Sequence, residues 1–139
     1  MSALPRLAER VLRYSLVAVW LITAAVSVWE LDGQSRALLV GLPAALGQPG
    51  TKTAIVLAGA AADAALGLWM AWRPGRAAYA AALLLMAVMT LLASVIQPDL
   101  WLHPLGPLSK NLPIAAVLWV LWQAAPRKAA ADDGAKVER

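Results

Sequence analysis

Residues 53–72 read TAIVLAGAAADAALGLWMAW and carry a single charged side chain, Asp63. About 20 apolar residues, at about 1.5 Å of helix each, cross the roughly 30 Å hydrocarbon core of a bilayer. The run ends at Trp72-Arg73-Pro74-Gly75-Arg76, where proline and glycine predict a tight turn. Residues 77–97 then form a similarly long run without any charge. We therefore predict two antiparallel membrane helices that are joined by a short basic turn.

Two further apolar runs flank this pair, at residues 14–29 and 112–125. The last run provides only about 21 Å of helix, so the residues before it must occupy the remaining depth of the bilayer. In that segment Pro104, Gly106 and Pro107 exclude a simple helix. We predict a short re-entrant-like segment there, followed by a fourth helix with Asn111 as its N-cap.

The composition supports a chain that lies almost entirely in the bilayer. Of its 139 residues 61% are hydrophobic and 14% are charged, whereas soluble domains carry about 25% charged residues. The absence of cysteine excludes disulfides, thiolate metal sites and cysteine nucleophiles. The sequence predicts an all-α membrane protein with one four-transmembrane-helix bundle at residues 1–126 and a disordered cytoplasmic tail at residues 127–139.

The basic residues are distributed unequally between the two sides of the predicted bundle. Nine fall on one side, and they are Arg6, Arg10, Arg13, Arg73, Arg76, Arg127, Lys128, Lys136 and Arg139. Only Arg36, Lys52 and Lys110 fall on the other side. This bias predicts a multi-pass protein of the bacterial cytoplasmic (inner) membrane with both termini in the cytoplasm. Because the charges flank apolar segments and form no patch, nucleic acid is excluded as a partner.

Polar residues repeat at i, i+4 and i+7 along two of the predicted helices, and so share a face of each. They are Thr23, Ser27 and Glu30 in the first helix and Thr90, Ser94 and Gln97 in the third. Asp63 and Thr23 each lie ten residues from an arginine, so both are about 15 Å deep, at the midplane. These positions predict an outward-opening cleft that ends at Asp63. Its candidate site residues are Thr23, Glu30, Asp63, Thr90, Lys110 and Asn111.

Each of these features also has a purely structural interpretation. Serine and threonine in membrane helices often bond to the carbonyl four residues earlier in their own helix. A protonated Asp63 hydrogen-bonded to Thr23 would hold two helices together, and Glu30 and Lys110 match in depth as an ion pair. Gly59 and Gly67, on the face of Asp63, would let a neighbouring backbone approach. Asp63 stands out because an intramembrane carboxylate costs at least about 2.5–3.5 kcal/mol; we take it as a candidate proton site.

The sequence indicates neither a metal site nor an intrinsic cofactor. His103 is the single histidine, and a transmembrane b-type haem usually needs two axial ligands. We expect His103 to be an interfacial loop residue. No metalloprotease, redox-dithiol, phosphate-loop or dinucleotide motif occurs, so nothing indicates a catalyst that acts alone.

The segment from Trp101 to Pro113 has the pattern W-x-x-P-x-G-P-x-x-K-N-x-P. It resembles the signature of the DoxX-like membrane proteins, and Asp63-Ala-Ala-Leu-Gly67 is similar to that family's second helix. The resemblance covers roughly residues 13–123 and implies a four-helix fold. His103 departs from the family pattern, which is often acidic there. Relatives include a subunit associated with thiosulfate:quinone oxidoreduction, and others accompany redox enzymes. For this chain the resemblance implies a redox role that involves a separate partner.

Three functional hypotheses follow from the residues and the resemblance. The first is an accessory membrane subunit of a redox system with a quinone headgroup site, where Asp63 handles a proton while Lys110 and Asn111 face a carbonyl or anion. The second is a non-catalytic scaffold or assembly subunit, and the third is a small-molecule passage. Besides the lipid bilayer, the expected partner is a membrane or redox protein, or a second copy of the chain. If the Asp63→Asn substitution has no effect, the scaffold hypothesis is favoured.

Overall fold

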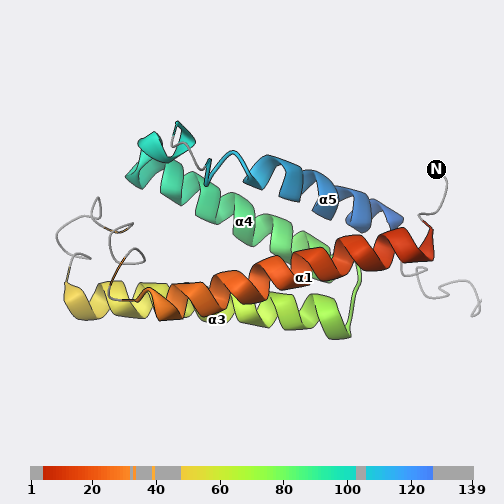
Figure 1. Cartoon of the computed structure of the whole chain (residues 1–139), viewed down its shortest axis with the longest axis horizontal. Coiled ribbons are helices and arrows are strands. Elements are labelled where there is room, and N and C mark those ends of the chain that lie inside the picture. Colours follow the sequence, from red (N-terminus) through yellow and green to blue (C-terminus); the bar gives the residue numbers. More distant parts are fainter. Residues whose placement is uncertain (1–4, 32, 34–38, 40–47, 103–105, 127–139) are drawn as a thin grey trace, which may run out of the picture.

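The computed structural model describes residues 5–31, 33, 39, 48–102 and 106–126. This part of the chain is all-helical and contains no strand (Figure 1). Its elements are α1 (Arg6–Trp29), α3 (Pro49–Trp72), α4 (Arg76–Ile96), the 3₁₀-helix η2 (Pro98–Trp101) and α5 (Asn111–Ala124). By length and composition α1, α3 and α4 are able to cross a membrane, whereas α5 is a shorter apolar helix. The predicted tail at 127–139 and His103 lie outside the described residues.

The predicted apolar runs locate the helices, but two helices begin earlier than hydropathy alone predicts. α1 begins at Arg6, directly after Pro5, because the polar residues before Tyr14 include good helix formers and Glu9 lies in the first turn. α3 begins at Pro49, since proline is tolerated in the first helical turn, and it ends at Trp72 as predicted. α4 matches the predicted run to within one residue at each end.

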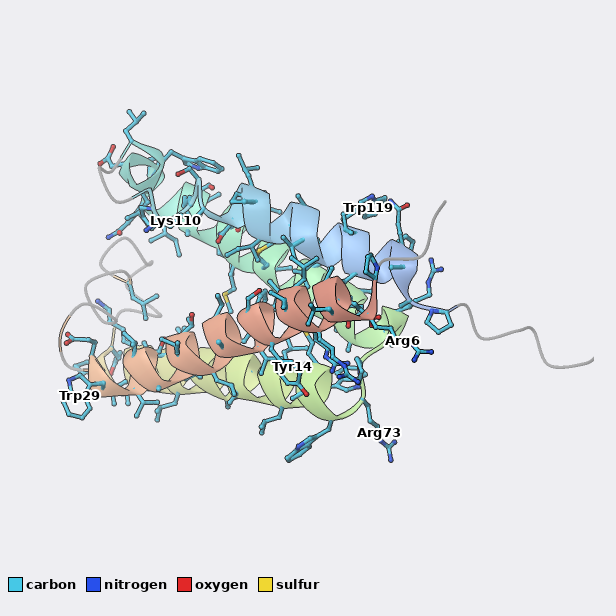
Figure 2. All side chains as sticks on the ribbon, turned by 45° about the vertical axis from the view of Figure 1, so that its right-hand side comes forward. Arg6, Tyr14, Trp29, Arg73, Lys110 and Trp119 are labelled. Atoms are coloured by element: carbon cyan, nitrogen blue, oxygen red, sulfur yellow. The ribbon has the colours of Figure 1, made fainter. Side chains whose placement is uncertain are left out.

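The four helices form two pairs. α1 packs along α3, and α4 packs along α5, whereas contacts between the pairs are much fewer. The pairs converge at one end and separate toward the other (Figure 1). Arg6 and Arg73 lie at the converging end, which we call the arginine end, and Trp29 and Lys110 lie toward the other, the open end (Figure 2). Arg6, at the polar start of α1, and Arg73, in the turn between α3 and α4, thus lie at the same end of the molecule (Figure 2).

The buried core occupies the half of the molecule near the arginine end. Its residues come from all four α-helices and are Leu16, Val17, Trp20, Leu66, Met70, Ala78, Tyr79, Ala82, Leu118 and Leu121. At this end the Arg76 guanidinium also stacks over the Trp122 ring, 4.1 Å from its centroid. Fewer side chains are buried toward the open end. The core therefore holds the two helix pairs together at the arginine end and leaves space between them toward the open end.

The segment before α5 folds back onto α4. η2 packs against α4, Gly106 adopts a positive φ of 53°, and the side chain of Leu108 is buried. Asn111, the first residue of α5, donates a hydrogen bond to Thr90 over 2.8 Å. α4 continues six residues beyond Thr90, which is about 9 Å of helix. The start of α5 therefore lies beside the middle part of α4 and not beside the end of α4.

The prediction that Asn111 caps α5 is wrong. Lys110 occupies the N-cap position, and no side chain there bonds to the backbone of the helix. The Asn111 amide is used instead in the hydrogen bond to Thr90, which lies 21 residues earlier. A cross-helix partner has thus replaced the local capping bond that the sequence favours.

Candidate functional site

A pocket of about 170 Å³ lies between the two helix pairs. All four α-helices contribute to its wall, through Val19, Trp20, Thr23, Asp63, Leu85, Met86, Met89, Asn111 and Ile114. A dry cavity of about 150 Å³ is known to hold one benzene molecule. The pocket therefore has room for a single six-membered ring, next to three polar side chains.

Three of the six candidate residues, Thr23, Asp63 and Asn111, meet in this wall. They come from three different helices: Thr23 from α1, Asp63 from α3 and Asn111 from α5. The other lining residues are apolar apart from the indole N–H of Trp20, so a few polar groups stand in an otherwise apolar wall. Such a combination is typical of pockets that orient a largely apolar ligand through a few polar contacts.

Asp63 is half-buried near the middle of α3 and has no hydrogen-bond or charge partner among the described residues. In particular, its carboxyl group is not bonded to Thr23, which excludes the predicted structural role as a link between α1 and α3. Intramembrane carboxyl groups are costly and usually paired. Asp63 therefore differs from most intramembrane carboxyl groups in having no partner among the described residues while it lines a pocket.

Thr90 does not line the pocket but positions a residue that does. Its hydroxyl donates to the Met86 carbonyl over 2.7 Å, four residues earlier in α4, and accepts from Asn111 Nδ2 over 2.8 Å. The bond within the helix matches the structural interpretation of intramembrane threonine. The second bond places the Asn111 side chain at the pocket wall.

Ser94, one turn further along α4, has the same double role. Its hydroxyl donates to the Thr90 carbonyl over 2.7 Å and accepts from the Trp101 indole nitrogen over 2.9 Å. The polar face that the sequence predicted on this helix therefore binds η2 and the start of α5, and it does not line an open cleft. The hydrogen bonds from Trp101 to Ser94 and from Asn111 to Thr90 thus attach η2 and the start of α5 to α4.

Glu30 and Lys110 lie outside the pocket wall. They do not form the predicted ion pair with each other, although both are among the described residues. The Glu30 carboxylate turns back over its own helix end, where a Cβ added at Gly33 would lie 2.5 Å from Oε2. Lys110 is exposed toward the open end (Figure 2). The separation of the helix pairs at this end keeps the two residues apart.

The apolar part of the wall was not recognised from the sequence. It includes Trp20, which is only 6% exposed, and the thioethers of Met86 and Met89. One feature of the sequence does indicate Trp20. Membrane tryptophans usually lie near the ends of an apolar run, whereas Trp20 lies in the interior of its run. The methionines gave no such signal, since an apolar residue in an apolar helix does not reveal which face it occupies.

In the described part of the chain, no three histidine, cysteine or acidic side chains lie close enough together to hold a metal ion. The polar groups that line the pocket are one carboxyl group, one hydroxyl group, one amide and the indole N–H of Trp20. These groups can exchange hydrogen bonds with a polar ring substituent, and the carboxyl group can also take up or release a proton.

The described part of the chain is all-helical, with three helices long and apolar enough to cross a membrane and a ring-sized pocket between two helix pairs. The chain belongs to the DoxX-like family, whose pattern matches residues 17–119. The pocket-lining residues, from Val19 to Ile114, all fall within this range. No curated protein and no solved structure matches the chain.

Proposed function

We propose that the chain is an accessory subunit of a redox system in the bacterial cytoplasmic membrane, and that its pocket binds the ring of a quinone-class lipid. The observation that carries this proposal is the unpartnered Asp63 carboxyl group beside an apolar, ring-sized pocket. Membership of the DoxX-like family supports it, because the resemblance implies partnership with redox enzymes.

The proposed topology has four spans and both termini in the cytoplasm. Arg6 and Arg73 lie at one end of the molecule, and the positive-inside rule assigns that end to the cytoplasm (Figure 2). α5 has only 14 residues, so η2 and the residues up to Lys110 complete the fourth crossing against α4. In this orientation Asp63 and the pocket lie near the middle of the bilayer, where a lipid-dissolved ring can reach them.

The lining residues suit a ring with oxygen substituents. Thr23, Asp63 and Asn111 can exchange hydrogen bonds with ring oxygens or ring hydroxyl groups, while Trp20, Met86 and Met89 offer aromatic and thioether surface to the ring itself. A quinone takes up two electrons and two protons on reduction, and Asp63 is placed to exchange a proton. The chain has no cysteine and one histidine, so the electrons would pass through a separate redox partner.

We expect a short-chain quinone such as decylubiquinone to bind the purified protein in lipid nanodiscs and to quench tryptophan fluorescence saturably, since Trp20 lines the pocket. The reduced form, decylubiquinol, can donate a hydroxyl proton to the Asp63 carboxylate, and loss of such a charge-assisted hydrogen bond costs about 1.5–3 kcal/mol. Asp63→Asn should therefore weaken the binding of decylubiquinol by about tenfold or more. Fluorescence titration measures this change.

Asp99→Asn is the matched control, because Asp99 lies on η2, is exposed and does not line the pocket. It should leave the affinity unchanged. Quenching that rises linearly with the quinone concentration in the wild type, without saturation, would show partitioning into lipid alone and would contradict the proposal. The same holds if Asp63→Asn and the wild type bind decylubiquinol equally well.

The scaffold hypothesis is the second candidate, and the close packing at Gly67 favours it. A Cβ at this position would lie 2.9 Å from Leu21 Cδ2 and 3.3 Å from Trp20 Cβ. Under this hypothesis Asp63→Asn has no effect on quinone affinity or on any partner activity, and bulky residues at Gly67 disrupt assembly. A passage through one copy of the chain is less well supported, because the buried core closes the arginine end.

A further inference from the structure

Two hydrogen bonds determine which atom of the Asn111 amide faces Thr90. The Thr90 hydroxyl donates its one proton to the Met86 carbonyl over 2.7 Å. Its oxygen can therefore only accept from a third group. With that proton on the Met86 carbonyl, the Asn111 atom that lies 2.8 Å away is the donor Nδ2, and turning the amide would require Thr90 to give up its bond to Met86.

The carbonyl oxygen Oδ1 is consequently left for the pocket that Asn111 lines. Asp63 adds further acceptors, because a carboxyl group keeps at least one acceptor oxygen in either protonation state. Thr23 is the flexible member of the set, since its hydroxyl both donates and accepts. Asn111 Oδ1 and Asp63 thus offer acceptor oxygens that only a hydrogen-bond donor on the ligand can satisfy.

The geometry points to a ligand that donates a hydrogen bond, and we propose that the pocket selects the hydroxyl-bearing, reduced form of the ring over the oxidised form. This inference rests on the proposed function and names the redox state of its ligand. A quinol or an alkylphenol can donate its hydroxyl proton to Asn111 Oδ1 or to Asp63. A quinone has only carbonyl oxygens, which accept, and would face Oδ1 with a second acceptor.

The remaining donors do not reverse this preference. The second Nδ2 proton of Asn111, the Thr23 hydroxyl and the Trp20 indole N–H are the donors that the wall offers to a ligand oxygen. A ring hydroxyl accepts from them while it donates to Oδ1 or Asp63, so it uses both kinds of group. A ring carbonyl uses the donors alone and leaves the acceptors of Asn111 and Asp63 without partners, which costs affinity in a site with little water.

The test compares two probes that differ in one hydrogen-bond donor, 4-nonylphenol and its methyl ether 4-nonylanisole. Both partition into nanodiscs, and neither changes redox state during the measurement. Net affinities, corrected with empty nanodiscs, are taken from tryptophan quenching or calorimetry. The phenol should bind about tenfold more tightly than the ether. Decylubiquinol should likewise exceed decylubiquinone when both are held at a fixed ambient potential.

Thr90→Val tests whether Thr90 sets this preference by positioning Asn111. Valine has nearly the same shape but cannot accept from Nδ2, so the Asn111 amide is free to turn. The phenol-to-ether affinity ratio should fall toward unity. Thr90→Ser keeps the hydroxyl and should restore the ratio. Because the ratio compares two ligands on the same variant, a general loss of stability does not change it, and thermal unfolding shows whether each variant is folded.

The outcomes separate this inference from the proposed function. Equal binding of phenol and ether, or tighter binding of decylubiquinone than of its quinol, overturns the donor preference while the pocket remains a ring site. Binding of none of the four probes overturns both. An unchanged ratio in Thr90→Val overturns the role assigned to Thr90.

Discussion

Gly67 shows how individual residues fix the distance between α1 and α3. A Cβ there would lie 2.9 Å from Leu21 Cδ2, 3.1 Å from Leu21 Cγ and 3.3 Å from Trp20 Cβ. The leucine methyl group can move, but Cγ and the tryptophan Cβ are close to the backbone of α1. We expect Gly67→Ala to destabilise the protein by about 1–3 kcal/mol, the usual range for overpacking. The midpoint of SDS-induced unfolding in mixed micelles measures the change.

Gly59 provides the matched control on the same helix. An added Cβ would meet no atom of the described residues within 4 Å, so the prediction that this glycine admits a neighbouring backbone is wrong within the chain. Gly59→Ala should be neutral or should stabilise α3 by at most about 1 kcal/mol, because alanine has the higher helix propensity. Equal destabilisation by both substitutions would show that the Gly67 contact carries no special weight.

The sequence predicts the relative positions of two pocket-lining residues, because these follow from local geometry. Ten residues separate Asp63 from Arg73 and Thr23 from Arg13, and this spacing places both at one depth, where the structure brings them into one pocket wall. The environment of Asn111 does not follow in this way. Its hydrogen bond to Thr90 joins residues 21 positions apart, and a local capping signal gives no information on such a partner.

At the scale of elements, hydropathy locates the apolar part of each helix but not its polar extension. α1 begins at Arg6, although the apolar run starts at Tyr14, because helix propensity and the backbone hydrogen bonds continue through charged residues. The same limit applies to Pro98–Trp101, which forms the short 3₁₀-helix η2. Its proline excludes an α-helical continuation of α4 without specifying the structure that replaces it.

The hydrogen bond from Trp101 to Ser94 attaches η2 to α4. We expect Ser94→Ala to raise hydrogen exchange at the amides of residues 99–102 and 108–111 by about fivefold, which corresponds to one lost hydrogen bond of about 1 kcal/mol. The amides of Arg76–Met86 should not change, because they belong to the part of α4 that packs in the core. Hydrogen–deuterium exchange with mass spectrometry in nanodiscs resolves these segments.

Ser15→Ala is the control for this exchange experiment. The Ser15 hydroxyl also bonds to a carbonyl of its own helix, that of Leu12 over 2.7 Å, and it lies on α1, away from η2. Its replacement should leave exchange at residues 99–111 unaltered. If Ser94→Ala also left that exchange unaltered, the attachment of η2 would depend on the apolar contact of Leu108 instead.

At the scale of the whole molecule, the arrangement into two pairs was not predictable from the sequence. Apolar residues surround each helix, so no narrow stripe indicates which neighbour it contacts, and the fixed α3–α4 turn defines only one adjacency. The cleft that the sequence predicts is correspondingly longer than the pocket. Depth alone assigns Glu30 and Lys110 to it, but the pairs separate toward the open end and the pocket wall does not include either residue.

The unequal packing along the bundle predicts unequal motion. The core residues hold the two pairs together near the arginine end, whereas contacts between the pairs are few elsewhere. The chain lacks cysteine, so spin labels can be attached at introduced cysteines alone. Labels at the exposed Val28 of α1 and Val95 of α4 should give a broad distance distribution by electron paramagnetic resonance. A ligand that contacts both Asp63 and Asn111 connects the two helix pairs. Addition of 4-nonylphenol should therefore narrow the distance distribution between these two labels.

Labels at Val11 and Ala80, exposed positions of the same two helices near the arginine end, form the control pair. Their distance distribution should be narrow and should not respond to the ligand, because the core fixes the helices there. Equal widths at the two ends would show that the pairs move as one rigid body despite the few contacts between them. If the ligand narrowed the distance distributions of both label pairs, the movement would involve the whole bundle. The pocket would then close by tighter packing of all four helices rather than by rotation of one pair about the arginine end.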